Sequence, residues 1–342
     1  MKAEIKRYFE NLNPRQLGLK EKIKVKSISK IGMGKNNSNF LVVVGSKKFV
    51  FRLNMLPLSR DKTKTEFNSL KLVEKLNIGP KAWILDESRK ILDSDFMILD
   101  YIEGKTLGKM NYKLDKKLIK KIVRLCVGFH LIPIRREIAK LPKDEVDYKV
   151  VFKWIEHFYS SIKNMTKHKA FLEMVSESCD VLRKSSLQKD KHPIVLAHGD
   201  ICEQNVIVHN GKLKLVDFES LGLTDPASEI AYILTQFTRG GFTEKQKEIF
   251  IEEYLKVRND KTLRKRLKIF VPLKNFADLV WAINHVFKIK NKRLHRYYLE
   301  NNKLNKDISY AKKMFKKNLR EGIVNKKYKN LDLGEVLNEK RV

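Results

Sequence analysis

The first hundred residues alternate short apolar segments with polar turns, a pattern typical of a small antiparallel sheet. Strand-like segments cover 24–30, 39–44, 48–53, 82–86 and 95–101. Gly45 and Ser46 separate the second segment from the third, as in a two-residue hairpin. Apolar residues at helical spacing predict a helix over 64–76, and a shorter amphipathic helix lies within 1–17.

After Gly104 the apolar spacing changes to a helical period. Helices are predicted over 116–131, 150–163, 170–184, 227–237, 244–257, 262–290 and 293–319. A strand-rich island interrupts them at 194–197, 206–209 and 213–216. We therefore expect an α+β chain of two lobes, a small antiparallel sheet in 1–103 and a larger, mostly helical lobe in 104–342.

The strand-rich island carries the chain's most informative polar residues. Residues 196–218 read LAHGDICEQNVIVHNGKLKLVDF, which places Asp200, Asn205 and Asp217 around a loop and a hairpin. Phosphoryl transfer to a hydroxyl needs a carboxylate near the hydroxyl proton and oxygen ligands for magnesium on the phosphates. One Asn and one Asp suffice as protein ligands, because magnesium keeps several waters and phosphate oxygens. The stretch therefore predicts an ATP- and Mg²⁺-dependent kinase.

This stretch resembles the aminoglycoside phosphotransferase and choline kinase family, whose members are relatives of protein kinases. The family signature is an HGD-x4-N loop followed by an apolar strand and Asp-Phe. Gly199 and Glu219 differ from the protein-kinase pattern and agree with the small-molecule kinases. The resemblance implies a two-lobed protein-kinase-like fold with Asp200 as catalytic base and Asn205 and Asp217 as magnesium ligands. His198 would brace the loop.

Residues 224–231 resemble the family's Gly-Asp-Pro-x-x-Asp-Leu-Ala segment, with Asp225 in place and Glu229 as the second acid. Asp225 is also a candidate for the N-cap of a helix that starts near Ala227. Trp281 and Ala282 resemble a further family motif more weakly.

Arg52 lies in the apolar segment FVFRL, where the family's third strand carries the basic residue for the α- and β-phosphates. Arginine stays charged and binds phosphate in a fork. Glu66 is the expected partner that would hold Arg52, and Glu74 is its rival. The alternative is an exposed strand face with Arg52 in solvent.

The turn at 31–39 reads IGMGKNNSN and suits a loop whose backbone amides cover phosphates. In the family this turn is often reduced, so Ser38 or Asn39 is the expected phosphate contact. A lone GxG is common, and the full GxGxxG pattern is missing.

Residues 96–104 resemble the family's hinge strand. The resemblance implies that backbone groups from Asp100 to Ile102 meet the adenine of ATP. Ile98 and Leu215 would line the adenine pocket, or they are plain core residues.

Charge and cysteine content bear on partners and on location. The formal net charge is +32, and residues 286–342 hold 17 Lys and Arg against 6 Asp and Glu. Such a balance favours polyanionic partners such as nucleic acid, or reflects a lysine-rich proteome. Three cysteines at irregular spacing fit a reducing cytoplasm. We expect no membrane span and no secretory leader.

The acceptor of the phosphate is not fixed by these motifs. Candidate acids are Glu203 and Glu219, and Trp154, Tyr159 and Trp281 are candidates for an aromatic wall. The positive charge favours a neutral or anionic acceptor over a strongly cationic one. A small-molecule hydroxyl acceptor is our first hypothesis. A macromolecular acceptor (RNA such as tRNA, or protein) is the second, and a non-catalytic binding module is the third. No pattern indicates an oligomeric state.

Overall fold

The computed structural model divides into two compact units, 1–113 with 203–221, and 114–202 with 222–342. It describes residues 1–33, 37–55, 62–142, 156, 159–160, 162–183, 193–237, 241–292, 304–321 and 326–338. The sequence predicts two lobes that are each continuous in the chain, with a boundary after residue 103. That boundary remains a prediction.

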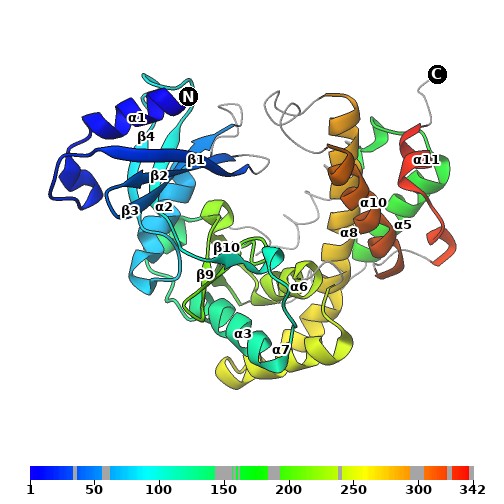
Figure 1. Cartoon of the computed structure of the whole chain (residues 1–342). Helices are drawn as coiled ribbons and strands as arrows, with labels where there is room; N and C mark the ends of the chain where they lie inside the picture. Colours follow the sequence, from blue (N-terminus) through cyan, green and yellow to red (C-terminus); the bar gives the residue numbers. More distant parts are fainter. Residues whose placement is uncertain are drawn as a thin grey trace. The chain divides into compact units, whose positions relative to one another are not determined.

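The first unit is built on a five-stranded sheet in the order β1-β2-β3-β5-β4, with antiparallel neighbours throughout (Figure 1). The strands are β1 (Val25–Met33), β2 (Asn37–Val44), β3 (Lys47–Asn54), β4 (Ala82–Asp86) and β5 (Phe96–Asp100). Gly45 has a φ of 60° in the two-residue turn between β2 and β3. The predicted hairpin is therefore confirmed.

The two faces of this sheet differ in character because successive side chains of a strand alternate. Phe49, Phe51 and Leu53 of β3 belong to an apolar cluster on one face. That face packs against α1 (Lys2–Asn11) through Ile5 and Phe9. The opposite face of β3 carries Val50, Arg52 and Asn54, toward α2 (Thr63–Val73).

The first unit also contains a small sheet of β6 (Lys105–Thr106), β8 (Val206–His209) and β9 (Lys212–Leu215). Gly104 precedes β6 with a φ of 138°, and a Cβ built there would lie 2.2 Å from the Val208 carbonyl oxygen. Only glycine therefore lets the chain approach β8 so closely. After β9 the chain forms the 3₁₀ turn η7 (Phe218–Ser220).

The second unit is mostly helical. Its helices are α3 (Lys116–His130), α5 (Lys169–Arg183), α6 (Pro226–Gln236), α7 (Glu244–Val257), α8 (Leu263–Lys290), α10 (Leu304–Glu321) and α11 (Leu333–Asn338). Helix α8 packs against α6 and α10, and α3 packs against α7 (Figure 1). The pair β7 (Val195–Ala197) and β10 (Gly222–Thr224) is antiparallel. Among the described residues, no helix is both long and apolar enough to cross a membrane.

The predicted strands and most predicted helices are confirmed, with ends that shift by a few residues. The short 3₁₀ segments of the described residues were not predicted as such; besides η7 they are η1 (Pro14–Leu17), η3 (Glu74–Leu76), η4 (Leu107–Lys109), η5 (Ile138–Lys140) and η8 (Lys326–Tyr328). Most of the predicted helix 150–163, and residues 293–303 of the last predicted helix, lie outside the described residues.

Candidate active site

Arg52 is the centre of an ion cluster in the first unit. Its Nε lies 2.9 Å from Glu66 of α2, and its Nη2 lies 2.5 Å from Asp217. Glu219 follows at 4.0 Å from the same Nη2. Arg52 and Glu66 are buried, with 8% and 2% of their surfaces exposed. The solvent-exposed alternative for Arg52 is therefore wrong, and we call these four residues the ion cluster.

Glu66, not Glu74, pairs with Arg52. Glu66 lies on the buried face of α2, and its Oε1 also accepts a hydrogen bond from the Phe218 amide at 3.3 Å. Glu74 instead lies near Lys71 and Lys81, each at 3.5 Å. Glu66 thus joins α2 to both β3 and the segment that follows Asp217.

The ion cluster contains one cation, Arg52, and three carboxylates, and this imbalance determines the direction of the pKa shifts. Burial opposes the charge of Arg52, but Glu66, Asp217 and Glu219 outweigh it and raise the pKa of the guanidinium. Burial raises the pKa of Glu66 above the ordinary carboxyl range, with Arg52 opposing and the other two acids adding to the shift. Carboxylate oxygens of Glu66, Asp217 and Glu219 lie within 4.8 Å of one another, close enough to share a cation.

Asn205 and Asp217 come together at one end of the β8–β9 hairpin. Val206 pairs with Leu215, and the Val216 amide donates to the Asn205 carbonyl at 3.0 Å. Asp217 follows directly, with a left-handed backbone (φ 71°) that aims it away from the strand direction. The hairpin thus places both predicted magnesium ligands at the same edge of the first unit.

Ser38 and Asn39 lie in β2 on opposite faces of the sheet. Asn39 is the register partner of Arg52, so the two side chains share a face. Ser38 pairs with Leu53 on the face of the apolar cluster. Among the described residues, neither Ser38 Oγ nor Asn39 Oδ1 has a hydrogen-bond partner although both atoms are buried. Asn39 therefore shares the face of Arg52, whereas Ser38 lies on the face of the apolar cluster.

The predicted hinge residues, Asp100 to Ile102, begin at the last residue of β5. The Asp100 carboxylate accepts the Trp83 indole N–H at 2.6 Å, and the Asp100 amide donates to the Lys81 carbonyl. The Tyr101 amide donates to the Lys48 carbonyl of β3. Ile102 therefore carries the first amide after the two that bond to neighbouring backbone.

The two apolar residues proposed for the adenine pocket are both fully buried. Ile98 belongs to the apolar cluster on the α1 face, which confirms the core interpretation for this residue. Leu215 is fully buried in β9.

Asp200 belongs to the second unit, in the loop after β7. Its amide donates to His198 Nδ1 at 3.2 Å, and the buried His198 ring packs edge-on against Phe129 of α3. Gly199 between them has a φ of 80°, a backbone conformation that glycine adopts without strain. His198 therefore braces the loop, as the sequence predicts. The Asp200 carboxylate accepts a hydrogen bond from the Tyr232 hydroxyl of α6.

Glu229 of α6 holds the backbone of the same loop. Its Oε1 accepts from the Gly199 amide at 2.9 Å, and its Oε2 lies 2.7 Å from His130 Nε2. His130 Nδ1 contacts the Tyr254 hydroxyl at 2.8 Å, and Cys126 Sγ lies 3.6 Å from Glu229. Burial alone would raise the pKa of Glu229, but hydrogen bonds from His130 and Gly199 lower it. The 2.7 Å between Glu229 Oε2 and His130 Nε2 is a hydrogen-bond distance. Cys126, His130 and Glu229 therefore fit a hydrogen-bond network better than a metal site.

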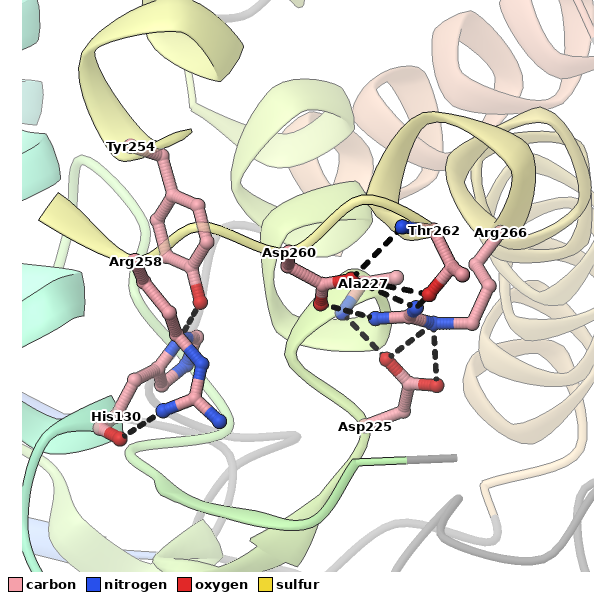
Figure 2. Close-up of polar contacts among 8 residues, drawn as sticks. All are labelled: His130, Asp225, Ala227, Tyr254, Arg258, Asp260, Thr262 and Arg266. Carbon is pink, nitrogen blue, oxygen red and sulfur yellow. Dashed lines mark hydrogen bonds and ion pairs between the residues drawn. The ribbon is translucent and has the colours of Figure 1, made fainter. Parts of the chain in front are cut away.

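A buried ion pair fixes the first turn of α6 (Figure 2). Asp225 caps the helix by accepting from the Ala227 amide at 2.7 Å, so the capping interpretation is confirmed. Arg266 of α8 pairs with Asp225 at 2.9 Å and with Asp260 at 2.7 Å. Arg266 and Asp225 are 3% and 0% exposed. The end of α6 that holds the loop is therefore anchored to α8.

The residues proposed for acceptor binding have different surroundings. Glu203 is buried and accepts the Tyr112 hydroxyl at 2.8 Å. Trp281 stacks on His285 with ring centroids 4.9 Å apart, and Lys163 lies over the Tyr159 ring. Trp154 lies outside the described residues.

Sequence reasoning did not place Glu219 in the ion cluster and did not single out Tyr232 beside Asp200. Glu219 was expected near the acceptor but lies in the ion cluster, and its place two residues after Asp217 was the available signal. Tyr232 carried no sequence signal, because its contact with Asp200 depends on how α6 packs beside the loop.

A kinase-like sheet with a buried Arg–Glu pair, and a hairpin ending in Asp-Phe-Glu, define a phosphotransferase of the kinase-like class. The sequence profile of the Phosphotransferase enzyme family matches residues 27–267. This match spans well over half of the chain, so the chain belongs to that family and is a phosphotransferase. A comparison with curated proteins finds no match.

Solved structures of kinases have the same fold. The choline kinase of Cryptosporidium parvum Iowa II is 15% identical, with a TM-score of 0.64 over 94% of this chain and 95% of that one. An aminoglycoside phosphotransferase assigned in Ralstonia eutropha JMP134 is 13% identical, with a TM-score of 0.63 over 94% and 98%. The ADP-bound aminoglycoside phosphotransferase APH(2'')-Ib is 19% identical, with a TM-score of 0.56 over 85% and 95%. The expected α+β kinase-like fold is confirmed.

Proposed function

We propose that the chain is an ATP-dependent phosphotransferase that moves the γ-phosphate of Mg-ATP to a hydroxyl of a small-molecule acceptor. In this proposal Asp200 is the catalytic base, and Asn205 and Asp217 hold magnesium. Arg52 binds the α- and β-phosphates and Glu66 orients it. The observation that carries the proposal is the ion cluster, which joins a buried guanidinium to carboxylates from two other elements.

The donor atoms of the first unit fit Mg-ATP. Magnesium prefers hard oxygen ligands and takes only one or two carboxylates when phosphates complete its shell. Asn205 and Asp217 supply such oxygens at one hairpin end, and Asp217 is 31% exposed and thus open to a ligand. Arg52 is a forked donor for phosphate oxygens. Asn39 lies on the Arg52 face, and its side-chain N–H₂ group would be a donor for the same phosphates.

The nucleobase is the second part of the nucleotide that this unit would bind. The amides of Asp100 and Tyr101 serve the sheet, so the Ile102 amide and the neighbouring carbonyls are the hinge groups that adenine would meet. An ADP-bound relative of the same fold supports the choice of an adenine nucleotide.

Asp200 would act on the acceptor hydroxyl. Bound magnesium would neutralise charge on the phosphates, which is its usual contribution in this chemistry. Asp200 would orient the acceptor O–H and take its proton as the oxygen forms its bond to phosphorus. Loop residues His198 and Gly199 hold the Asp200 backbone in place for this role.

Small-molecule acceptors are favoured over macromolecules by the comparisons. Structures with a similar fold include a choline kinase, an ethanolamine kinase and aminoglycoside phosphotransferases. These similarities give no support to nucleic-acid binding, and a protein or RNA acceptor remains the alternative proposal. The strong positive charge is the one observation on its side.

The test is ATP consumption by the purified protein against pools of hydroxyl metabolites and total RNA, with Asp200→Asn as the blank. We expect Asp200→Asn to lose turnover and to keep Mg-ATP binding, measured as a shift in melting temperature. Asp217→Asn should lose that shift. Turnover by Asp200→Asn at the wild-type rate would disprove the assignment of the base.

Glu248→Gln is a matched control, because it changes an exposed carboxylate of the second unit that pairs only with Arg264 among the described contacts. It should match the wild type in turnover and in the Mg-ATP shift. Nucleotide binding with no turnover on any pool, and no hydrolysis of ATP by the wild type, would favour a binding module instead.

A further inference from the structure

We propose that Tyr232 is the positioning residue of the catalytic base: its hydroxyl holds one oxygen of Asp200, so that the other oxygen receives the proton of the acceptor. The proposal rests on the assignment of Asp200 as the base. It adds a residue of α6 to the machinery, and neither the family signature nor the sequence pattern indicates this residue.

Two residues of α6 hold two successive residues of the loop. Glu229 and Tyr232 are three positions apart and therefore share a face of the helix. Glu229 accepts from the Gly199 amide, and Tyr232 donates to Asp200 Oδ1. The helix thus fixes the backbone at one residue and the side chain at the next.

Tyr232 is suited to be a donor at all working pH values. Burial and the neighbouring Asp200 carboxylate raise the pKa of the phenol well above its ordinary value. The hydroxyl therefore stays protonated and can only donate to the carboxylate. A donor held on one oxygen stabilises the ionised form of Asp200, which is the form that accepts a proton.

The donor is held on a rigid support. Asp225 and Arg266 fix the first turn of α6, and Glu229 is fixed in turn by His130 of α3. Tyr232 lies two turns from the cap, still within this anchored helix. A phenol ring has few rotatable bonds, so little freedom is lost when it orients the carboxylate.

In this proposal the two carboxylate oxygens of Asp200 have different roles. Asp200 Oδ1 accepts from Tyr232, while the Asp200 backbone amide is taken by His198. The acceptor hydroxyl would donate to Oδ2. Its proton would move to that oxygen as the acceptor oxygen bonds to the γ-phosphorus and the bond from phosphorus to the ADP oxygen breaks. ADP leaves with that electron pair, and Tyr232 keeps its own proton.

The test uses hydrolysis of Mg-ATP, with water as the acceptor, and therefore needs no identified substrate. Tyr232→Phe removes the hydroxyl and keeps the ring. We expect kcat to fall between about 10-fold and 100-fold, the range for one hydrogen bond to a charged group, with KM for ATP within about twofold. The acid limb of the pH–rate profile should move to higher pH, because the ionised base loses a donor.

A double-variant cycle separates positioning from simple structural support. If Tyr232 acts through Asp200, the double variant Asp200→Asn, Tyr232→Phe should be no slower than Asp200→Asn alone. Tyr328→Phe is the matched control, because it removes another tyrosine–carboxylate bond of the same unit, to Glu177 at 2.9 Å. It should leave kcat and the pH profile unchanged.

A failure of the role proposed for Tyr232 can be distinguished from a failure of the role proposed for Asp200. Hydrolysis by Asp200→Asn at the wild-type rate would reject the base itself. If Asp200→Asn is inactive and Tyr232→Phe keeps the wild-type kcat and pH profile, only the role of Tyr232 is rejected. Equal losses in Tyr232→Phe and Tyr328→Phe, with lowered melting temperatures, would also reject positioning.

Discussion

A single buried guanidinium balances three carboxylates at the core of the first unit, and this imbalance gives Arg52 two roles. It holds β3, α2 and the segment after β9 together before any ligand binds. In the proposed mechanism Arg52 would also bind phosphate once a metal ion takes over Asp217. Structural stability and ligand binding would then depend on the same side chain.

Arg52→Met should destabilise the protein strongly, by about 3 kcal/mol, because removing one partner of a buried pair leaves uncompensated charge. Magnesium alone should raise the melting temperature of this variant more than that of the wild type, since the cation would relieve the three acids. Thermal unfolding with and without Mg²⁺ measures both effects. Lys64→Met, which removes an exposed pair with Glu87, should change neither, and an equal response to Mg²⁺ in Arg52→Met and wild type would contradict the expectation.

Burial of Asp278 in α8 leads us to expect that the stability of the protein depends on pH. Burial raises its pKa from 3.8 to about 7, against the lowering effect of Lys274, Lys317 and a hydrogen bond from Gln236. The native state thus binds this proton more tightly than the unfolded chain does. The contribution of Asp278 is fully favourable below about pH 4 and is lost as pH rises through 7.

Asp278→Asn should therefore stabilise the protein relative to wild type at pH 8, by about 2–4 kcal/mol, and much less at pH 5. Urea unfolding at the two pH values gives both differences. A gain in stability of the same size at pH 5 and pH 8 would show that the Asp278 carboxyl does not titrate in this range.

In the proposed mechanism, helix α6 is the element of the second unit that holds the loop of Asp200. Asp225 begins it, Glu229 and Tyr232 hold the loop, and Gln236 at its end hydrogen-bonds to Asp278. The first turn of α6 is fixed by a buried N-cap and a buried ion pair, which both use the Asp225 carboxylate.

Two variants of Asp225 should separate the cap from the ion pair. Asp225→Asn keeps a capping oxygen and removes the charge, whereas Asp225→Ala removes both. We expect losses of about 3 kcal/mol for Asn and about 1 kcal/mol more for Ala. Thr243→Ala at the exposed capping box of α7 is the control and should cost about 1 kcal/mol. Chemical denaturation measures all three, and equal losses for Asn and Ala would mean that the cap adds nothing.

The sequence allowed prediction of elements far better than of their contacts. Alternation in β2 and β3 and the Gly45–Ser46 turn were sufficient to predict the hairpin, because these signals are local. Pairing of Arg52 with Glu66 was predictable only through the family resemblance. Tyr232 could not be predicted, because helical periodicity says which face of α6 is buried and not which loop lies against it.

The charge of the whole molecule exceeds what the proposed reaction needs. A net charge of +32 attracts any polyanion at low salt, and such binding weakens steeply as salt rises. Binding to RNA would therefore not by itself identify RNA as the acceptor.

We expect total RNA to bind in low salt and to leave ATP consumption unchanged within about twofold, with binding lost near 0.2 M salt. Filter binding and an ATP-consumption assay on the same samples check this. RNA-dependent turnover that persists at 0.2 M salt and is lost in Asp200→Asn would instead identify RNA as the substrate.

The buried thiols have a practical consequence for site-specific labelling of the protein. Cys126, Cys179 and Cys202 are 0%, 2% and 9% exposed, so maleimide reagents should react with them slowly in the native protein. Cysteines introduced at two exposed positions, Ser46 in the β2–β3 turn and Lys261 before α8, would then carry fluorescent dyes without removal of the native residues. Energy transfer between such dyes would report the distance between the two labelled positions with and without Mg-ATP.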